Sequence, residues 1–146
     1  MPDVPRPDLA ALIVPLGRAL TAAEQPVLRA LQLSMWGYSV LLRLDSQPIR
    51  SQASLAETIG ADKSRLIEVL DELQHRELIT RTPDPTDRRV RLLALTPKGR
   101  RLRDTARRAI QTNEQRLLDL LPAGERSAFL TTLQRIAAAA PDVFNE

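Results

Sequence analysis

The stretch SLAETIGADKSRLIEVLDELQHRELITRTPDPTDRRVRLLALTPKGRRL, residues 54–102, decides the fold of this chain. Its first part predicts two short helices with only the residues Gly-Ala-Asp between them. We expect Ser51 to cap the first helix, which ends at Gly60, and Asp62 to cap the second, which runs to Leu78. The apolar residues spaced to pack inward on the second helix are Leu66, Val69, Leu70 and Leu73.

A β-hairpin is expected directly after these helices. The run from Leu78 to Thr82 is β-prone, a turn with two prolines and two aspartates follows, and a second β-prone run extends from Arg88 to Thr96. The predicted inward-facing residues of the second run are Val90, Leu92 and Ala94, and the outward-facing ones are Arg89, Arg91 and Leu93. Two short helices followed by a hairpin predict a winged helix-turn-helix, with the hairpin as the wing.

Helical patterns continue on the N-terminal side of this segment. Asp8 is placed to cap a helix whose apolar residues recur at helical spacing. Pro15 and Pro26 fall inside this helix and are expected to kink or interrupt it. Ser34 is placed to cap a second helix that continues through Leu44.

On the C-terminal side, Thr96 is placed to cap a long helix with Pro97 at its first position, reaching about Leu121. Pro122 then opens a last helix. The chain has 146 residues and only four aromatic side chains, so its core must be built mainly from Leu, Ile, Val and Ala. These features predict one mainly α domain, residues 1–146, with a small β-hairpin wing.

Several classes of protein are disfavoured by what the sequence lacks. The chain has no cysteine and one histidine, so neither thiol chemistry nor a Cys/His zinc site is expected. Serine-hydrolase, metalloprotease and phosphate-loop motifs are also missing, so we expect no enzyme, cofactor or metal. The apolar run from Leu9 to Leu16 is too short to cross a bilayer and follows Asp3 and Asp8. We therefore expect a cytoplasmic protein, associated with the nucleoid.

The basic residues are concentrated in one part of the chain. Residues 76–108 hold eleven basic and four acidic side chains, a net charge of +7. The remaining residues hold ten basic and fourteen acidic side chains, a net charge of −4. A local block of this kind is typical of a protein that binds a polyanion.

The predicted wing and second short helix give this charge a role in binding DNA. The short helix would enter the major groove, with free backbone N–H groups at its start that favour phosphate. Asp84 and Asp87 would orient Arg88 or Arg89 toward a narrow minor groove, and Arg91 would contact phosphate or join an ion pair. The candidate DNA-binding residues are Ser51, Gln52, Asp62, Lys63, Ser64, Arg65, Glu68, Arg81, Asp87, Arg88, Arg89 and Arg91.

The segments LAETIGADKS and LITRTPDPTDRRVRLLALTPKG, together with the helix order, resemble the MarR (multiple antibiotic resistance regulator) family of bacterial transcription regulators. The resemblance implies a homodimer that binds a pseudo-palindromic DNA operator and is controlled by a small, often aromatic, ligand. Three positions depart from the family pattern. Ile67 replaces a commoner Ser or Thr, Glu68 stands where Arg or another polar residue is frequent, and Glu77 replaces a glycine. Glu68 would accept from a cytosine amino group or, as we prefer, pair with Arg65 or Lys63.

The terminal helices carry apolar faces that need a partner. We expect them to pack across a two-fold axis, as the resemblance implies, rather than within one chain; residues 8–33 and 97–146 then form the dimerisation part and residues 34–96 the DNA-binding part. The candidate interface residues are Leu9, Leu12, Ile13, Leu16, Leu117, Leu120, Leu121, Phe129, Leu130, Leu133 and Ile136.

A ligand pocket is expected between the dimerisation helices and the DNA-binding part. Trp36 and Tyr38 are candidates to line it, although either residue is more often a core side chain. Arg18 and Arg50 are candidates to bind an anionic ligand. Since nothing in the sequence fixes this pocket, a DNA-binding regulator without any ligand is the alternative, and either repression or activation fits.

Overall fold

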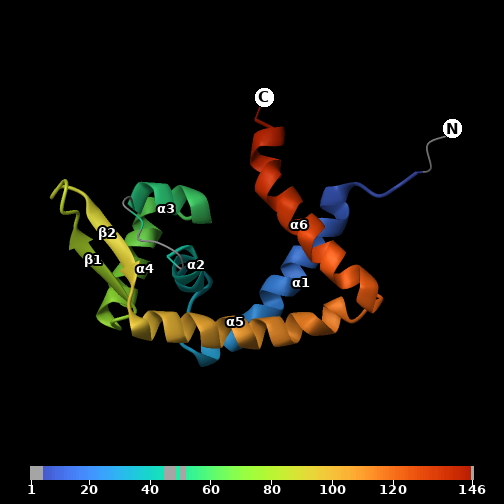
Figure 1. Ribbon diagram of the computed structural model, residues 1–146, viewed down its shortest axis with the longest axis horizontal. Coiled ribbons are helices and arrows are strands. Elements are labelled where there is room, and N and C mark those ends of the chain that lie inside the picture. The colour runs from blue at the N-terminus through green and yellow to red at the C-terminus, as the bar shows by residue number, and fades with distance from the viewer. Residues whose placement is uncertain (1–4, 45–48, 50–51, 146) are drawn as a thin grey trace. The chain divides into compact units, whose positions relative to one another are not determined.

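The computed structural model describes residues 5–44, 49 and 52–145 of the chain. Among these residues it forms six helices and one two-stranded antiparallel sheet (Figure 1). The elements are α1 (Leu9–Ala30), α2 (Met35–Arg43), α3 (Gln52–Ile59), α4 (Lys63–His75), β1 (Ile79–Pro83), β2 (Arg91–Leu95), α5 (Pro97–Leu118) and α6 (Ala123–Val143). The predicted class, mainly α with a hairpin wing, is confirmed.

Three helices begin where a capping side chain predicts. The Ser34 hydroxyl accepts from the backbone N–H of Gly37 at 2.9 Å, at the start of α2. The Thr96 hydroxyl accepts from the N–H of Gly99 at 3.0 Å, at the start of α5. Asp62 makes the equivalent contact at the start of α4. Each side chain replaces a hydrogen bond that the first turn of a helix lacks. Ser51, the predicted cap of α3, lies outside the described residues.

Two expectations about the helices need correction. Of the kink or interruption expected at Pro15 and Pro26, the interruption is wrong, because α1 continues through both prolines. Each proline removes one internal hydrogen bond, and both are exposed, so water can reach the carbonyl groups that lose a partner. The helix α4 ends at His75 instead of Leu78, because Glu77 adopts a left-handed backbone conformation with φ of 61°.

The hairpin forms where it was predicted, but β2 begins at Arg91 instead of Arg88, and the buried face is different. The register pairs Ile79 with Leu95 and Arg81 with Leu93. Leu93 is fully buried, whereas Leu92 and Val90 are half-buried, so the predicted alternation in β2 is wrong. The reason is packing: Leu93 stands opposite Arg81, on the face of the hairpin that Arg81 joins to α4. The backbone of Ile49 also exchanges hydrogen bonds of 2.9 and 2.8 Å with Leu93 on the open edge of β2.

The described residues fall into two compact units, residues 1–110 and residues 111–146. The first unit holds a single core in which α1, α2, α3, α4, the hairpin and the start of α5 take part. Its fully buried large side chains are Leu28, Val40, Leu41, Leu55, Leu66, Leu70, Leu78, Ile79 and Leu93. The second unit consists of the end of α5 and α6. Among the described residues, no helix combines the length and apolar character that crossing a bilayer requires.

Candidate nucleic-acid interface

The helix α4 has one face in the core and one face in solvent, as its sequence predicts. Leu66, Val69, Leu70 and Leu73 are buried. The exposed residues of its first two turns are Lys63, Ser64, Arg65, Ile67 and Glu68. This division fixes the rotation of α4 about its axis, so the same five side chains are always offered to a partner.

The N-terminus of α4 carries its own acidic cap. The Asp62 carboxylate accepts a hydrogen bond of 2.8 Å from the N–H of Arg65. One of the N–H groups that we expected to be open to phosphate is therefore occupied. Asp62 acts as a helix cap, and the remaining N–H groups of the first turn stay available to an anion.

Glu68 does not form the ion pair that we preferred from the sequence. Within the described residues, its exposed carboxylate has neither a hydrogen bond nor an ion pair with Arg65 or Lys63. The reason is spacing: Arg65 lies three residues before Glu68 on the helix, with the basic residue N-terminal, an orientation that favours pairing least. The Glu68 carboxylate is therefore available to a molecule that binds to α4.

The tip of the wing is a compact turn organised by two aspartates. Asp84 is only 4% exposed, and its carboxylate accepts from the N–H and the hydroxyl of Thr86 at 2.8 and 2.7 Å. The backbone N–H of Asp84 bonds the carbonyl of Val90 at 2.8 Å and closes the loop. Asp84 therefore braces the turn from inside.

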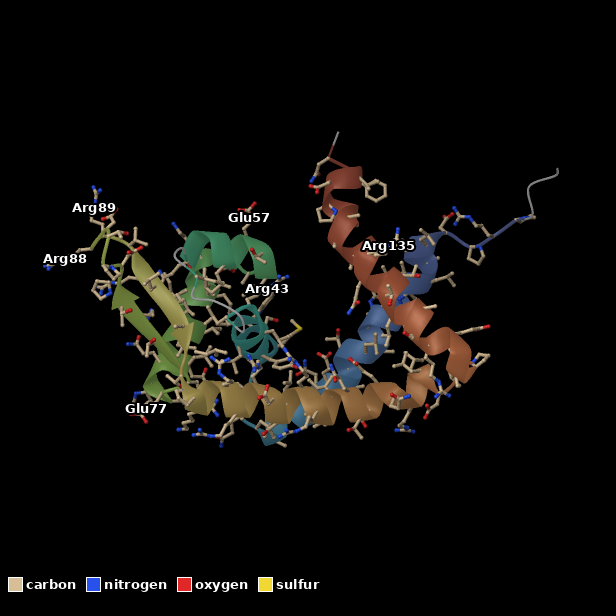
Figure 2. The ribbon with its side chains drawn as sticks, in the orientation of Figure 1. Arg43, Glu57, Glu77, Arg88, Arg89 and Arg135 are labelled. Carbon is tan, nitrogen blue, oxygen red and sulfur yellow. The ribbon has the colours of Figure 1, made fainter. Side chains whose placement is uncertain are left out.

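Asp87 holds one of the two arginines at this tip. Its carboxylate accepts from the backbone N–H of Arg89 at 3.1 Å and from the guanidinium Nε of Arg89 at 3.2 Å. The Arg89 side chain is nevertheless 92% exposed. Arg88 and Arg89 extend from the end of the hairpin into solvent (Figure 2). Asp87 thus directs one guanidinium while leaving it accessible.

Arg81 occupies a different position from the tip arginines. Its guanidinium pairs with the Asp71 carboxylate and donates to the side-chain oxygen of Gln74 at 2.6 Å, both on α4. Arg81 thus links β1 to α4. Its side chain is only 22% exposed, so it does not present a free positive charge to solvent. Asp71 and Gln74 were not predicted as partners of Arg81; their three-residue spacing places both on the polar face of α4 but does not show that this face meets β1.

A polar hollow of about 320 Å³ lies between the hairpin and the helices α3 and α4. It is lined by Gln52, Gln74, Arg81 and Arg91. Arg81 and Arg91 stand on neighbouring strands, two positions apart in the register. Arg91 is exposed and Gln52 is half-buried. Three of the candidate DNA-binding residues, Gln52, Arg81 and Arg91, are thus brought together.

One arginine of the basic segment, residues 76–108, is buried and pairs within the protein. Arg103 on α5 is buried, and its guanidinium donates two hydrogen bonds, 3.0 and 2.8 Å long, to the Asp104 carboxylate. The hydrogen bond from Arg103, together with the positive charges of Arg103, Arg107 and Arg108, lowers the pKa of Asp104. The net charge of residues 76–108 therefore overstates the charge that a polyanion would meet.

The candidate ligand-binding residues differ in how far they are buried. Tyr38 is buried in the core of the first unit, Trp36 is half-buried against it, and Arg18 is exposed. Arg50 lies outside the described residues. A second hollow, about 400 Å³, is lined among the described residues by Ser39, Leu42, Arg43, Thr58 and Ile59, and not by Trp36, Tyr38 or Arg18. The described residues contain no cluster of three potential metal ligands.

The candidate dimer residues are exposed in the single chain. Leu9, Leu12 and Ile13 on α1 are each more than half exposed. Leu16, Leu117, Leu120, Phe129, Leu130, Leu133 and Ile136 are exposed as well, and Leu121 is half-buried. Rows of exposed large apolar side chains at helical spacing are typical of surfaces that another chain covers.

A helix-turn-helix of α3 and α4, joined to a hairpin with arginines at its tip, defines a winged helix-turn-helix protein. The MarR family model matches residues 33–90, which run from the start of α2 to the end of the wing turn. A MarR-family transcriptional regulator from Rhodococcus sp. RHA1 has a solved structure with a TM-score of 0.73, 32% identity, and coverage of 90% of this chain and 98% of that chain. The chain belongs to the MarR family of transcriptional regulators.

Two solved structures of one repressor are also similar. CouR from Rhodococcus jostii RHA1, bound to p-coumaroyl-CoA, has a TM-score of 0.72 and 35% identity, and CouR bound to a 23-mer DNA duplex has 0.74 and 34%. Each match covers 89% of this chain and 92% of CouR. A putative transcriptional regulatory protein for the hcr operon of Thauera aromatica is 30% identical over 68% of this chain. That match spans 60% of the Thauera protein.

Proposed function

We propose that this chain is a homodimeric transcriptional repressor that binds a pseudo-palindromic operator in double-stranded DNA. The observation that carries the proposal is the wing tip, where Asp87 directs the exposed Arg89 beside the exposed Arg88. A guanidinium held at the end of a narrow hairpin fits the minor groove, where the potential of DNA is most negative. The DNA-bound structure of CouR supports the same class of partner. A cytoplasmic location, on the nucleoid, goes with this function.

The homodimer would use the exposed apolar faces of α1, α5 and α6. Residues 8–33 and 97–146 form the dimerisation part in this proposal, and residues 34–96 form the reading head. Because a closed dimer is two-fold symmetric, it presents two copies of α4 to one duplex. A spacing of about 34 Å between them places both in successive major grooves on one side of the DNA.

Release by a small aromatic or anionic ligand is the second part of the proposal. The solved complex of CouR with p-coumaroyl-CoA, and that of PcaV from Streptomyces coelicolor with its natural ligand, support ligand control. The candidate contacts in this chain are Trp36, Tyr38, Arg18 and Arg50. A ligand would act by favouring a separation of the two reading heads that no longer matches the DNA grooves.

The alternative is a DNA-binding regulator without a ligand, and the burial of Tyr38 in the core favours it. The two candidates are separated by a thermal-shift screen of phenolic acids and their thioesters, followed by a DNA-release measurement. A compound that raises Tm and releases DNA supports the ligand-controlled repressor. A protein that binds DNA and responds to none of these compounds supports the alternative.

The DNA-binding proposal is tested on the full-length protein with a duplex selected from a randomised library. The double variant Arg88→Ala/Arg89→Ala should bind this duplex at least tenfold more weakly, and because the dimer loses four arginines, the slope of log affinity against log salt should fall by up to about four. A control with the same loss of charge is Arg29→Ala/Arg116→Ala, which removes two exposed arginines outside α4 and the wing. Equal affinity and salt slope for wild type and the wing variant would refute the role of the wing.

A further inference from the structure

The exposed face of α4 carries one large apolar residue, Ile67, which is 45% exposed. The inward face of the helix is already complete with Leu66, Val69 and Leu70, all buried. Ile67 therefore contributes little to the core and leaves apolar surface in water. A single exposed apolar side chain is common on protein surfaces, but Ile67 lies on the face of α4 that would meet DNA, where it is placed to contact an apolar group on a base.

Its neighbour Glu68 carries the second unusual feature of this face. Glu68 is exposed, and within the described residues it makes no ion pair or hydrogen bond. An unpaired carboxylate on a helix that lies in a DNA groove is repelled by the phosphates. This cost is offset only where the carboxylate accepts a hydrogen bond from a base.

The helical spacing places these two residues on one patch. Ser64 lies three residues before Ile67 and four before Glu68, so the three side chains are neighbours on the helix surface. The next residue on this face, Asp71, is paired with Arg81. The chemistry that α4 offers at the centre of its exposed face is therefore one apolar side chain beside one free acceptor.

We propose that Ile67 and Glu68 make this protein a reader of pyrimidines: Ile67 packs on the C5-methyl group of thymine, and Glu68 accepts from the N4 amino group of cytosine. This assignment rests on the proposed function as a DNA-binding regulator. In the major groove the thymine methyl is the one apolar group on a base edge, and the cytosine amino group is a donor that carboxylates accept from. Each half-site then holds a thymine and a cytosine under the middle of α4.

The first test replaces thymine by deoxyuridine, which removes only the methyl group. The full-length protein is used to select duplexes from a randomised library, and each thymine of the selected half-site is then replaced in turn. At one position the dissociation constant should rise about fourfold per half-site, the factor expected for one methyl group no longer buried. Ile67→Ser should bind the thymine and deoxyuridine duplexes equally, and Ile67→Val should restore most of the difference.

The second test changes the base pair that Glu68 would contact and then Glu68 itself. Exchanging the contacted C·G pair for T·A should weaken wild-type binding about tenfold. In Glu68→Gln this preference should shrink to twofold or less, or move to adenine, whose N6 and N7 a glutamine amide matches. Because one negative charge is lost, Glu68→Gln should also bind all duplexes more tightly at low salt.

The outcomes separate the two proposals. Enrichment of no sequence would refute the proposed function and this assignment with it. A selected operator that tolerates deoxyuridine at every thymine would overturn the role of Ile67 alone. Unchanged base preference in Glu68→Gln would likewise overturn the role of Glu68. Both side chains are exposed, so folding of the variants is checked by their Tm and by their binding to a duplex of unrelated sequence.

Discussion

Arg76 and Gln32 are 44 residues apart in the chain, yet the guanidinium of Arg76 donates to the carbonyl oxygen of Gln32 at 2.6 Å. It also donates to the carbonyl of Leu31 at 3.1 Å. Both carbonyls lie just after α1, and Arg76 follows the last residue of α4. The carbonyl of Arg76 in turn accepts from Lys98 on α5 at 3.0 Å. One residue thus connects the recognition helix to the two helices that flank the reading head.

Removal of this link should loosen the reading head. Arg76→Ala leaves two carbonyls without their charged donor and should lower the free energy of unfolding by about 1–2 kcal/mol. Arg76→Lys retains the charge but not the planar group that reaches both carbonyls, so an intermediate loss is expected. Urea unfolding measures both variants. DNA affinity should fall with an unchanged salt slope, because Arg76 positions α4 and does not contact phosphate; a slope reduced by about two, one for each protomer of the dimer, would contradict this.

Glu77 should be replaceable by glycine with a gain in stability. The N–H of Leu78 bonds the carbonyl of Leu73 at 2.9 Å, and the N–H of Glu77 bonds that of Gln74 at 2.9 Å. This pattern ends a helix with a left-handed residue, and Glu77 has φ of 61°. Because glycine adopts this conformation without steric cost, Glu77→Gly should stabilise the protein by about 0.5–1 kcal/mol.

The same substitution five residues earlier provides the control. Glu72 is an exposed residue inside α4, where glycine costs about 1 kcal/mol of helix stability. Glu72→Gly should therefore lower Tm while Glu77→Gly raises it. Two changes in the same direction would show that the backbone conformation at Glu77 does not limit stability.

Local signals explain which parts of the fold could be predicted. The caps Ser34, Asp62 and Thr96 act within three residues of themselves, and the hairpin turn is encoded by its own prolines and aspartates. The inward face of β2 could not be predicted, because it depends on how the hairpin packs on α4 through Arg81. The end of α4 was also misplaced: glutamate is not a helix-ending residue, and only the glycine that the family has at this position indicates a left-handed conformation at Glu77.

The same division applies to the candidate site. The contact between Asp87 and Arg89 was predictable, because the two residues lie in one turn. The pairing of Arg81 with Asp71 was not, because it requires β1 to pack on α4 first. An arginine in a basic segment therefore says little about DNA contact until the position of nearby carboxylates is known.

Gly99, in the first turn of α5, should tolerate no side chain. A Cβ atom at this position would stand 2.0 Å from the carbonyl oxygen of Leu78 and 2.9 Å from its carbonyl carbon. Both are backbone atoms at the junction of α4 and β1, and they cannot move without disturbing the wing. Gly99→Ala should lower the free energy of unfolding by about 2–4 kcal/mol. Gly124→Ala, on α6, meets nothing within 4 Å and should leave Tm unchanged or higher.

Arg81 and Asp71 offer a way to change DNA affinity from outside the contacts with bases. Arg81→Ala should reduce stability by about 1 kcal/mol, with little effect on the salt slope, because its guanidinium is engaged by Asp71 and Gln74. Asp71→Asn removes a negative charge from α4 and weakens the hold on that guanidinium. DNA affinity should then rise, and the salt slope should steepen by about two, one for each protomer of the dimer, as Arg81 reaches a phosphate.

The double variant Asp71→Asn/Arg81→Ala distinguishes the released arginine from the lost carboxylate. If Arg81 supplies the new phosphate contact, the double variant returns to the wild-type salt slope and retains only the smaller gain in affinity that comes from the missing negative charge. If its slope stays as steep as that of Asp71→Asn, a different cation makes the contact, and Arg81 serves only to join β1 to the recognition helix.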